Sequence, residues 1–168
     1  MRNAASRAGY ESTHYNDRML STTNEILRDV EIAVQKTGDR AAAMDAVVDL
    51  LKQRVPDYTW VGIYLMDGDE LVLGPYRGKP SPHTRIPLGR GICGAAATEK
   101  ATIIVDDVNA DPRYLACSLE TRSEIVVPII KGSTVLGEID IDSDRPAAFT
   151  SDDKTLLEQV ASVLATRL

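Results

Sequence analysis

The sequence predicts an α+β domain in which helices at both ends of the chain bracket a central antiparallel sheet. Three patterns point to it. Apolar residues recur at helical spacing near the N-terminus, and again close to the C-terminus. Between these segments, short runs rich in β-branched residues alternate with turn residues. Helices grouped at the ends around such a sheet give a two-layer sandwich.

Composition limits the size and class of the protein. A chain of 168 residues with 43% hydrophobic content is expected to form one domain with a real core. The net charge of −6 argues against a nucleic-acid partner, which would require a basic face. No apolar run approaches the roughly 20 residues of a membrane span, and no signal-type segment begins the chain. We therefore expect no membrane association and a cytoplasmic location.

The first helix is expected after a polar leader. Residues 1–20 lack periodicity, so we interpret them as a flexible leader and residues 21–168 as the single domain. Thr22 with Glu25 three residues later has the form of a capping box. The segment 37–39 (Thr-Gly-Asp) ends this helix. Its apolar positions are Ile26, Leu27, Val30 and Val34.

Two more helices follow from the same reasoning. One ends before Pro56. The other closes the chain, and Thr150 with Asp153 marks its start in capping-box form. The apolar faces are Met44, Val47, Val48 and Leu51 in the first, and Leu156, Leu157, Val160, Ala161 and Leu164 in the second.

Five runs in the middle of the chain have strand character. The turn at 67–69 (Asp-Gly-Asp) and the turn at 131–133 (Lys-Gly-Ser) each predict a hairpin. The expected strands are 59–65, 70–73, 101–105, 124–130 and 134–142.

Strand alternation places a group of distinctive side chains on one face of the sheet. In the first strand, Trp60, Gly62 and Tyr64 share a face, and two aromatic rings flanking a glycine suggest a notch. In the last strand, Asp140 and Asp142 share a face, about 7 Å apart. Glu138 lies on that face too. Solvated carboxylates would explain this pattern, but their pairing with the aromatic notch favours a binding site.

The two cysteines occupy different contexts. Cys93 lies in a glycine- and alanine-rich stretch that suits the start of a helix, which would lower its pKa. Cys117 lies in a loop or short helix, where Arg113 or Arg122 could favour its thiolate. Each could instead be a small apolar residue that fills a gap. The chain lacks the paired Cys or His spacing of a zinc motif, so no metal is expected.

Six segments together resemble the free methionine-R-sulfoxide reductases, which are stand-alone enzymes of the GAF fold. The resemblance extends from about Ile26 to the C-terminus, and the matching segments come in the same order with similar spacing. They are WVGIYL at 60–65, LGPYRGK at 73–79, RIPLGRGICG at 85–94, AC at 116–117, SEIVVP at 123–128 and IDIDS at 139–143. The resemblance implies a GAF-like fold with helices packed on one face of the sheet, a ligand pocket on the other, and a homodimer.

The resemblance also implies roles for individual residues. Cys117 matches the catalytic cysteine, whose thiolate attacks the sulfoxide sulfur. Cys93 matches a second cysteine of variable role. The implied substrate-binding residues are Trp60 and Tyr64 around the methyl end and Glu124, Asp140 and Asp142 at the ammonium and sulfoxide ends.

Reduction of a sulfoxide requires both a thiol and a carboxyl group. A thiolate must attack sulfur, and a carboxyl group with a raised pKa must protonate the departing oxygen. The product is a sulfenic acid, which a second thiol condenses to a disulfide. No bound cofactor is expected. The partners are free methionine sulfoxide and a reductant, either thioredoxin or a small thiol.

One stretch departs from the family pattern. Typical members carry a third cysteine between the glycine-lysine and arginine-isoleucine pairs, and it resolves the sulfenic acid. Here residues 80–84 read Pro-Ser-Pro-His-Thr. Cys93 could take over if its Cα atom lies within about 7 Å of that of Cys117. Otherwise a small external thiol resolves Cys117, or the activity has been lost. His83 could assist or simply lie at the surface.

Two other functions remain open at the level of sequence. A GAF domain could bind a small ligand as a sensor without turnover, although it would then need a partner for output. Alternatively, Cys93 and Cys117 could form a regulatory disulfide in a thiol redox sensor. Turnover that depends on methionine sulfoxide separates the reductase from both.

Overall fold

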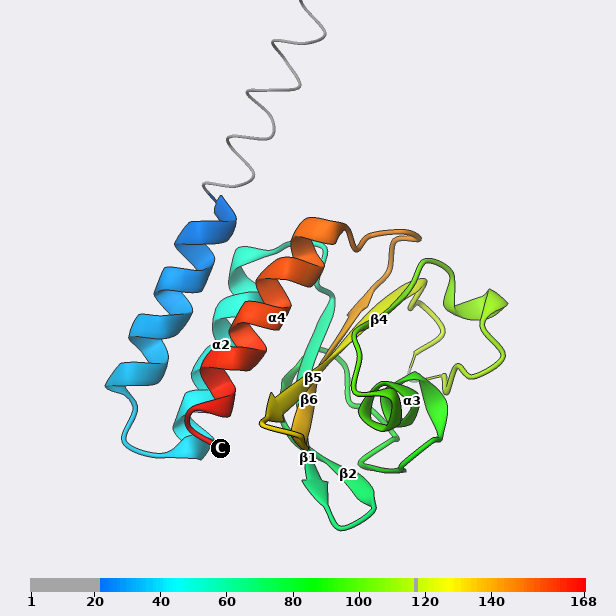
Figure 1. Cartoon of the computed structure of the whole chain (residues 1–168). Helices are drawn as coiled ribbons and strands as arrows, with labels where there is room; N and C mark the ends of the chain where they lie inside the picture. The colour runs from blue at the N-terminus through cyan, green and yellow to red at the C-terminus, as the bar shows by residue number, and fades with distance from the viewer. Residues whose placement is uncertain (1–21, 117) are drawn as a thin grey trace, which may run out of the picture.

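The computed structural model describes residues 22–116 and 118–168, so the predicted leader at 1–20 lies outside the described residues. A helix spans residues 22–36, and the break at 37–39 separates it from α2 (Arg40–Arg54), as the glycine in that segment predicts. The last long helix is α4 (Ser151–Ala165). These three helices stand together on one side of the sheet in Figure 1.

The sheet of the described residues is antiparallel throughout and has the order β3-β2-β1-β6-β5-β4. The α+β prediction is therefore confirmed. The turns at Gly68 and Gly132 have positive φ angles of 66° and 63°, which suits glycine. The strands are β1 (Trp60–Asp67), β2 (Glu70–Arg77), β3 (Arg85–Pro87), β4 (Ile103–Val105), β5 (Ser123–Lys131) and β6 (Thr134–Ser143).

Some boundaries differ from the sequence prediction for local reasons. Strand β2 continues through Gly74 and Pro75 to Arg77, whereas the sequence predicted a strand at 70–73. Strand β3 was not predicted, because an edge strand of three residues ending in Pro87 carries no period-2 signal. Among the short elements, α3 (Gly91–Glu99) follows the predicted glycine-alanine stretch, and a 3-10 turn spans Val108–Ala110.

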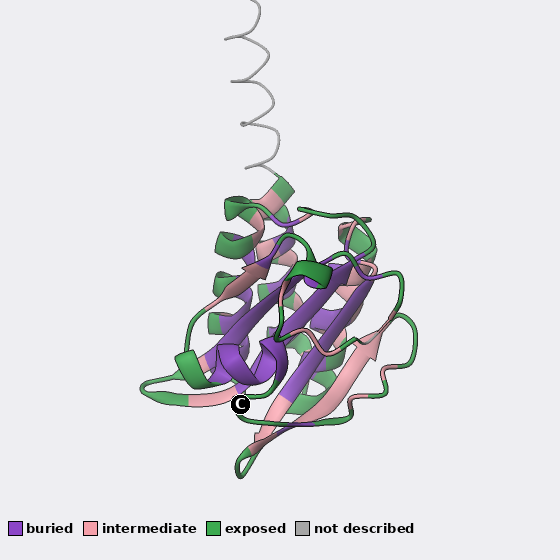
Figure 2. Ribbon diagram, turned by 90° about the vertical axis from the view of Figure 1, so that its right-hand side faces the viewer, coloured by how far each residue is buried: buried purple, intermediate pink, exposed green. Residues whose placement is uncertain are grey.

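Each face of the sheet has its own apolar core. The face toward the long helices contains Val61 and Ile63 of β1 together with Ile139 and Ile141 of β6, all fully buried. The opposite face contains Trp60 and Tyr64 and is covered by α3 and the loops around it. Figure 2 looks at this second face and shows α3 and the central strands behind it as buried. The sheet therefore has no fully solvated face at its centre.

The pairing of β1 with β6 fixes which side chains meet on the second face. Trp60 lies opposite Asp142, Gly62 opposite Asp140, and Tyr64 opposite Glu138. Because side chains alternate along both strands, the aromatic and acidic residues fall on one face in the same register. The predicted alternation of both strands is confirmed.

None of the helices formed by residues 22–116 and 118–168 combines the length and apolar character needed to cross a membrane.

The N-terminus of α4 has the capping box that the sequence predicted. Thr150 accepts hydrogen bonds from the backbone N–H groups of Asp152 and Asp153, and the Asp153 carboxylate accepts from the backbone N–H of Thr150. We expect Thr150→Ala to lower the free energy of unfolding by about 1 kcal/mol, since orphan N–H groups lose their partner. Urea denaturation measures the effect. The matched control is Thr155→Ala within the same helix, which should raise it by up to about 0.7 kcal/mol because Ala has the higher helix propensity. Equal losses in both variants would contradict the capping account.

Candidate active site

Four carboxyl groups lie on the α3 side of the sheet and are almost completely buried. Glu138, Asp140 and Asp142 come from β6, and Glu124 comes from β5, where it pairs with Asp142. Their exposed fractions are 0%, 2%, 4% and 5%, respectively. The sequence prediction of a carboxylate face is confirmed in position. The alternative that these groups are simply solvated is wrong, because α3 and the neighbouring loops cover them.

Cys93, in the first turn of α3, points into this carboxyl cluster. Its Sγ atom lies 3.5 Å from Asp140 Oδ2 and 3.9 Å from Glu124 Oε1, so the thiol can donate a hydrogen bond to a carboxylate. We expected the helix N-terminus to lower the pKa of Cys93, and this expectation is wrong. Burial and the nearby charges of Asp140, Glu138 and Glu124 raise that pKa well above its ordinary value. Desolvation and three negative neighbours outweigh the partial charge of a helix end.

The pKa values of the carboxyl groups are also shifted upward. Burial is the largest cause for all four, because water no longer stabilises the charged form. The charge of Asp140 adds to the rise at Glu124, Glu138 and Asp142. The pKa of Asp140 itself rises to about 7. Near neutral pH the cluster therefore holds both protonated and ionised carboxyl groups.

The four carboxyl groups have few hydrogen-bond partners and no ion-pair partner among the described residues. None of the ion pairs formed by the described residues includes any of the four. The Oδ1 atom of Asp140 is buried without a hydrogen-bond partner in the described structure, and the buried carboxyl group of Glu138 has only the weakly donating thiol of Cys93 as a partner there. Buried polar atoms normally have partners, and their absence is a frequent mark of a site built for a ligand. The charge of the missing partner should be positive.

The aromatic side chains form a wall beside the carboxyl groups. Trp60 stacks on Tyr76 with ring centroids 5.7 Å apart, and its indole N–H donates to the carbonyl of Lys79. Tyr64 is fully buried, and its hydroxyl donates to the carbonyl of His83. The predicted notch at Gly62 is not open. The Trp60 ring covers this glycine so closely that an added Cβ atom would lie 2.2 Å from it.

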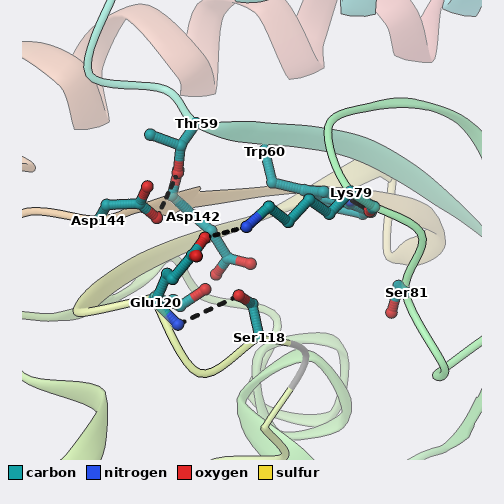
Figure 3. A pocket seen from close by; sticks show the side chains of 9 residues that line it. Thr59, Trp60, Lys79, Ser81, Ser118, Glu120, Asp142 and Asp144 are labelled. Atoms are coloured by element: carbon teal, nitrogen blue, oxygen red, sulfur yellow. Dashed lines mark hydrogen bonds and ion pairs between the residues drawn. The ribbon is translucent and has the colours of Figure 1, made fainter.

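A pocket of about 70 Å³ opens beside Trp60 and Asp142. Figure 3 shows the Asp142 carboxyl group between the Trp60 strand and the loop that carries Ser118 and Glu120. The exposed side chains of Lys79 and Glu120 form an ion pair that joins the loops on either side. Exposed pairs of this kind contribute little free energy, so this pair adds little to the closure of the pocket. The residues that line the pocket are Thr59, Trp60, Lys79, Ser81, Ser118, Glu120, Thr121, Asp142 and Asp144.

A second, much narrower crevice of about 10 Å³ reaches Cys93 and Glu124. His83 and Leu115 form part of its lining. The Nε2 atom of His83 lies 3.2 Å from the carbonyl oxygen of Ala116, at hydrogen-bond distance. His83 thus contacts the residue before Cys117. The pocket and the crevice share no lining residue: the pocket reaches Asp142, and the crevice reaches Glu124.

The structure brings together most, but not all, of the predicted site residues. Trp60 and Asp142 line the pocket, and Glu124, Asp140 and Cys93 form the cluster beneath α3. Tyr64 lies behind Trp60, 6.5 Å away between ring centroids, and does not line either cavity. Cys117 lies outside the described residues, so the predictions about it stay predictions.

Sequence reasoning missed several neighbours of the site. Glu138 was placed on the correct face but given no role, although its period-2 spacing with Asp140 was a usable signal. Tyr76 could have been found only by knowing that it pairs with Gly62 across β1 and β2. Arg113 pairs with Asp111 and Glu99 among the described residues, and the suggestion that it favours the Cys117 thiolate stays a prediction. The pocket residues Ser118 and Glu120 carry no motif of their own.

Comparison with known proteins identifies the class of this fold. The family model described as "GAF domain" matches residues 39–168, which is most of the chain. GAF domain-containing protein A of Dictyostelium discoideum is 38% identical over 140 residues, covering 83% of this chain and 87% of that protein. The chain therefore belongs to the GAF domain family.

A narrower group within that family is also supported. The free methionine-R-sulfoxide reductase of Escherichia coli (strain K12) is 40% identical over 121 residues, covering 70% of this chain and 73% of the relative. The reductase of Neisseria meningitidis, solved in complex with its substrate, has a TM-score of 0.83 and 39% identity, covering 86% of this chain and 87% of that chain. Within the GAF domains, the chain belongs to the free methionine-R-sulfoxide reductase family.

The raised carboxyl pKa values predict how stability depends on pH. In the folded state the four carboxyl groups keep their protons at pH values where the unfolded chain has lost them, which begins near pH 4. Their contribution to the free energy of unfolding is therefore fully present below that pH. It is lost as the pH rises through the pKa values that these groups have in the folded state. We expect the free energy of unfolding to fall as the pH rises from about 4 through about 7, where Asp140 titrates. Each group can contribute at most about 1.4 kcal/mol per pH unit. Denaturant titrations across this range measure it.

The variant Glu138→Gln is the matched control for this pH dependence. It keeps the shape of the side chain and removes one titrating group whose pKa burial raises. Its stability should fall less steeply with pH than that of the unsubstituted protein. Stability that rises over the same range in the unsubstituted protein would contradict the description of the cluster.

Proposed function

We propose that this chain reduces the R-sulfoxide of free methionine to methionine. The observation that carries the proposal is the buried carboxyl cluster beside a pocket, with no cationic side chain paired to it among the described residues. A free amino acid brings an ammonium group that such a site attracts. A methionine sulfoxide within a peptide lacks that group, so the same cluster selects for the free amino acid.

In this proposal, different carboxyl groups of the cluster bind the substrate and donate the proton. An ionised carboxylate binds the ammonium of the substrate, and a protonated carboxyl group donates a proton to the sulfoxide oxygen as it departs. A cluster in which the pKa of Asp140 lies about 7 offers both forms near neutral pH. Asp142 lines the pocket and is placed to meet the ammonium, whose positive charge favours the ionised form of this carboxyl group once the substrate is bound. Asp140 and Glu124, next to Cys93, are placed for proton transfer.

The aromatic wall accounts for the apolar end of the substrate. Trp60 lines the pocket and is held by its stack on Tyr76 and its hydrogen bond to Lys79. Its ring offers an apolar surface for the methyl and methylene groups. Tyr64 supports Trp60 from the interior, so its role is to position that ring rather than to touch substrate.

The reaction requires a thiolate, which we assign to Cys117. In the proposed step its sulfur attacks the sulfoxide sulfur and forms a sulfur–sulfur bond, while the sulfoxide oxygen takes up two protons and leaves as water. Water then attacks the sulfur of Cys117, the sulfur–sulfur bond breaks, methionine leaves, and the cysteine becomes a sulfenic acid. A second thiol then condenses with the sulfenic acid to a disulfide and releases water. The positions of the two residues next to Cys117 in sequence support this assignment. Ser118 lines the pocket, and the carbonyl oxygen of Ala116 lies at hydrogen-bond distance from His83, which lines the crevice.

The second thiol most consistent with the site is an external one. Cys93 is 6% exposed, and burial with three negative neighbours raises its pKa, so it holds little of the thiolate needed for attack. Residues 80–84 contain no cysteine. We therefore propose that a small thiol or a thioredoxin-like protein attacks oxidised Cys117 directly, and that Cys93 serves the carboxyl cluster. The homodimer implied by the family resemblance stays part of the proposal.

Turnover assays of cysteine variants test this assignment. We expect Cys117→Ser to lose reduction of free L-methionine-R-sulfoxide altogether, because the attacking sulfur is absent. Cys93→Ser should keep turnover driven by dithiothreitol. Release of methionine measures both. Full activity in Cys117→Ser would contradict the proposed nucleophile, and no turnover in the unsubstituted protein with either dithiothreitol or thioredoxin would contradict the function itself.

The ammonium-binding role is tested separately. We expect Asp142→Asn to lower kcat/KM by about tenfold to a hundredfold, mostly through KM, since a charged hydrogen bond is worth about 1.5–3 kcal/mol. The matched control is Asp67→Asn at the far end of β1, where the carboxylate pairs with Arg85 at the surface. Its kcat/KM should be unchanged. An equal loss in both variants would remove the specific role of Asp142.

A further inference from the structure

One sulfur and two carboxyl oxygens converge beneath α3 in a way that also suits a metal ion. Ligand atoms of Cys93, Glu124 and Asp140 all lie within 4.8 Å of one another, and all three residues are buried. They come from α3, β5 and β6, respectively. Because the three positions are far apart in sequence, the spacing argument that disfavoured a metal could not detect them.

A second observation is that the cluster contains unused ligand atoms. The Oδ1 atom of Asp140 is buried without a hydrogen-bond partner in the described structure, and the buried carboxyl group of Glu138 has no stronger donor there than the thiol of Cys93. Glu138 lies two residues before Asp140 on β6, so its side chain falls on the same face of the sheet as that of Asp140. A buried carboxyl oxygen without a partner is costly, and a bound cation removes that cost. The cluster thus has a fourth potential ligand.

The two distances from the Cys93 sulfur to carboxyl oxygens are close to those of a tetrahedral zinc centre. Zinc lies about 2.3 Å from a cysteine sulfur and about 2.0–2.2 Å from a carboxylate oxygen, so tetrahedral geometry separates sulfur and oxygen by about 3.5 Å. The Sγ atom of Cys93 lies 3.5 Å from Asp140 Oδ2 and 3.9 Å from Glu124 Oε1. The first distance matches, and the second requires a movement of a few tenths of an ångström.

We propose that this cluster binds Zn²⁺, with Cys93, Glu124 and Asp140 as ligands and Glu138 as the fourth or as its neighbour. The thiol selects a softer divalent ion over Mg²⁺ and Ca²⁺, which take all-oxygen sites. The narrow crevice lined by Cys93, Glu124 and His83 provides the approach. Zinc displaces the thiol and carboxyl protons, so its affinity rises with pH.

Zinc at this position also regulates the proposed reaction, a consequence that depends on the proposed function. The ion occupies the carboxyl groups needed by the ammonium and the sulfoxide oxygen of the substrate. It therefore competes with methionine sulfoxide and raises KM without changing kcat. A chelator that removes the ion restores the original KM.

Zinc binding is measured directly by competition with a chromogenic zinc indicator, without substrate. The full chain is kept reduced with a phosphine, because a thiol reductant would itself bind the metal. We expect one equivalent of Zn²⁺ per chain and no competition from Mg²⁺. Cys93→Ser should weaken the affinity by about tenfold to a hundredfold or more, while Cys117→Ser, the matched control, should keep it. Unchanged affinity in Cys93→Ser, or loss in Cys117→Ser, would overturn the site.

Cobalt identifies the ligands in the unsubstituted protein itself, so this readout does not require a variant that folds. Co²⁺ in place of Zn²⁺ should give the near-ultraviolet absorption of a thiolate–cobalt bond and the visible bands of a tetrahedral ion. We expect both in the unsubstituted protein and in Cys117→Ser. Circular dichroism of Cys93→Ser confirms its fold, and Glu124→Gln gives a second variant with reduced affinity. A cobalt complex without the thiolate band would contradict ligation by Cys93.

The zinc site and the proposed reaction can fail independently. Sulfoxide reduction without measurable zinc binding would overturn the metal site and leave the function standing. Zinc binding through Cys93 without reduction under any reductant would support the metal site and overturn the function. If both hold but zinc lowers kcat at unchanged KM, then the competition is wrong, because the ion and the substrate would not share the same carboxyl groups.

Discussion

The site depends on one constraint, the two-residue repeat of β6 within a sheet that is covered on both faces. The repeat sends Ile139 and Ile141 into the core beneath the long helices and Asp140 and Asp142 toward α3. A slip of one residue would bury charge in the main core and leave the site apolar. The apolar face therefore fixes the position of the acidic face, and the stability of the core holds the reactive groups in register.

This arrangement works against stability at the site itself. Carboxyl groups crowded under α3 lose hydration and repel one another, and the nearby thiol of Cys93 cannot ionise easily for the same reasons. Such conflict with the ordinary rules of burial is expected where a protein is built to receive a ligand. The substrate ammonium and a zinc ion are two cations that would relieve the same deficit. Binding specificity and sensitivity to metal would thus have one physical origin.

The sequence was sufficient for features that depend on local periodicity. It located the long helices and the faces of β1 and β6, because apolar residues recur every three to four positions in the helices and every two in the strands. It located the hairpin turns from their glycine-containing segments. It could not show that Cys93 lies between Glu124 and Asp140, since that requires the packing of α3 on β5 and β6. For the same reason it gave the wrong direction for the pKa of Cys93: the helix end was visible, but the burial was not.

The central claim is that the carboxyl cluster binds the ammonium of a free amino acid. The most direct measurement is calorimetric binding of free L-methionine-R-sulfoxide and of its N-acetyl derivative to the Cys117→Ser variant, which holds the ligand without turnover. The account predicts binding of the free amino acid and a large loss of affinity for the derivative, whose nitrogen carries no charge. Equal affinity for both would show that the cluster does not recognise the ammonium and would contradict the account.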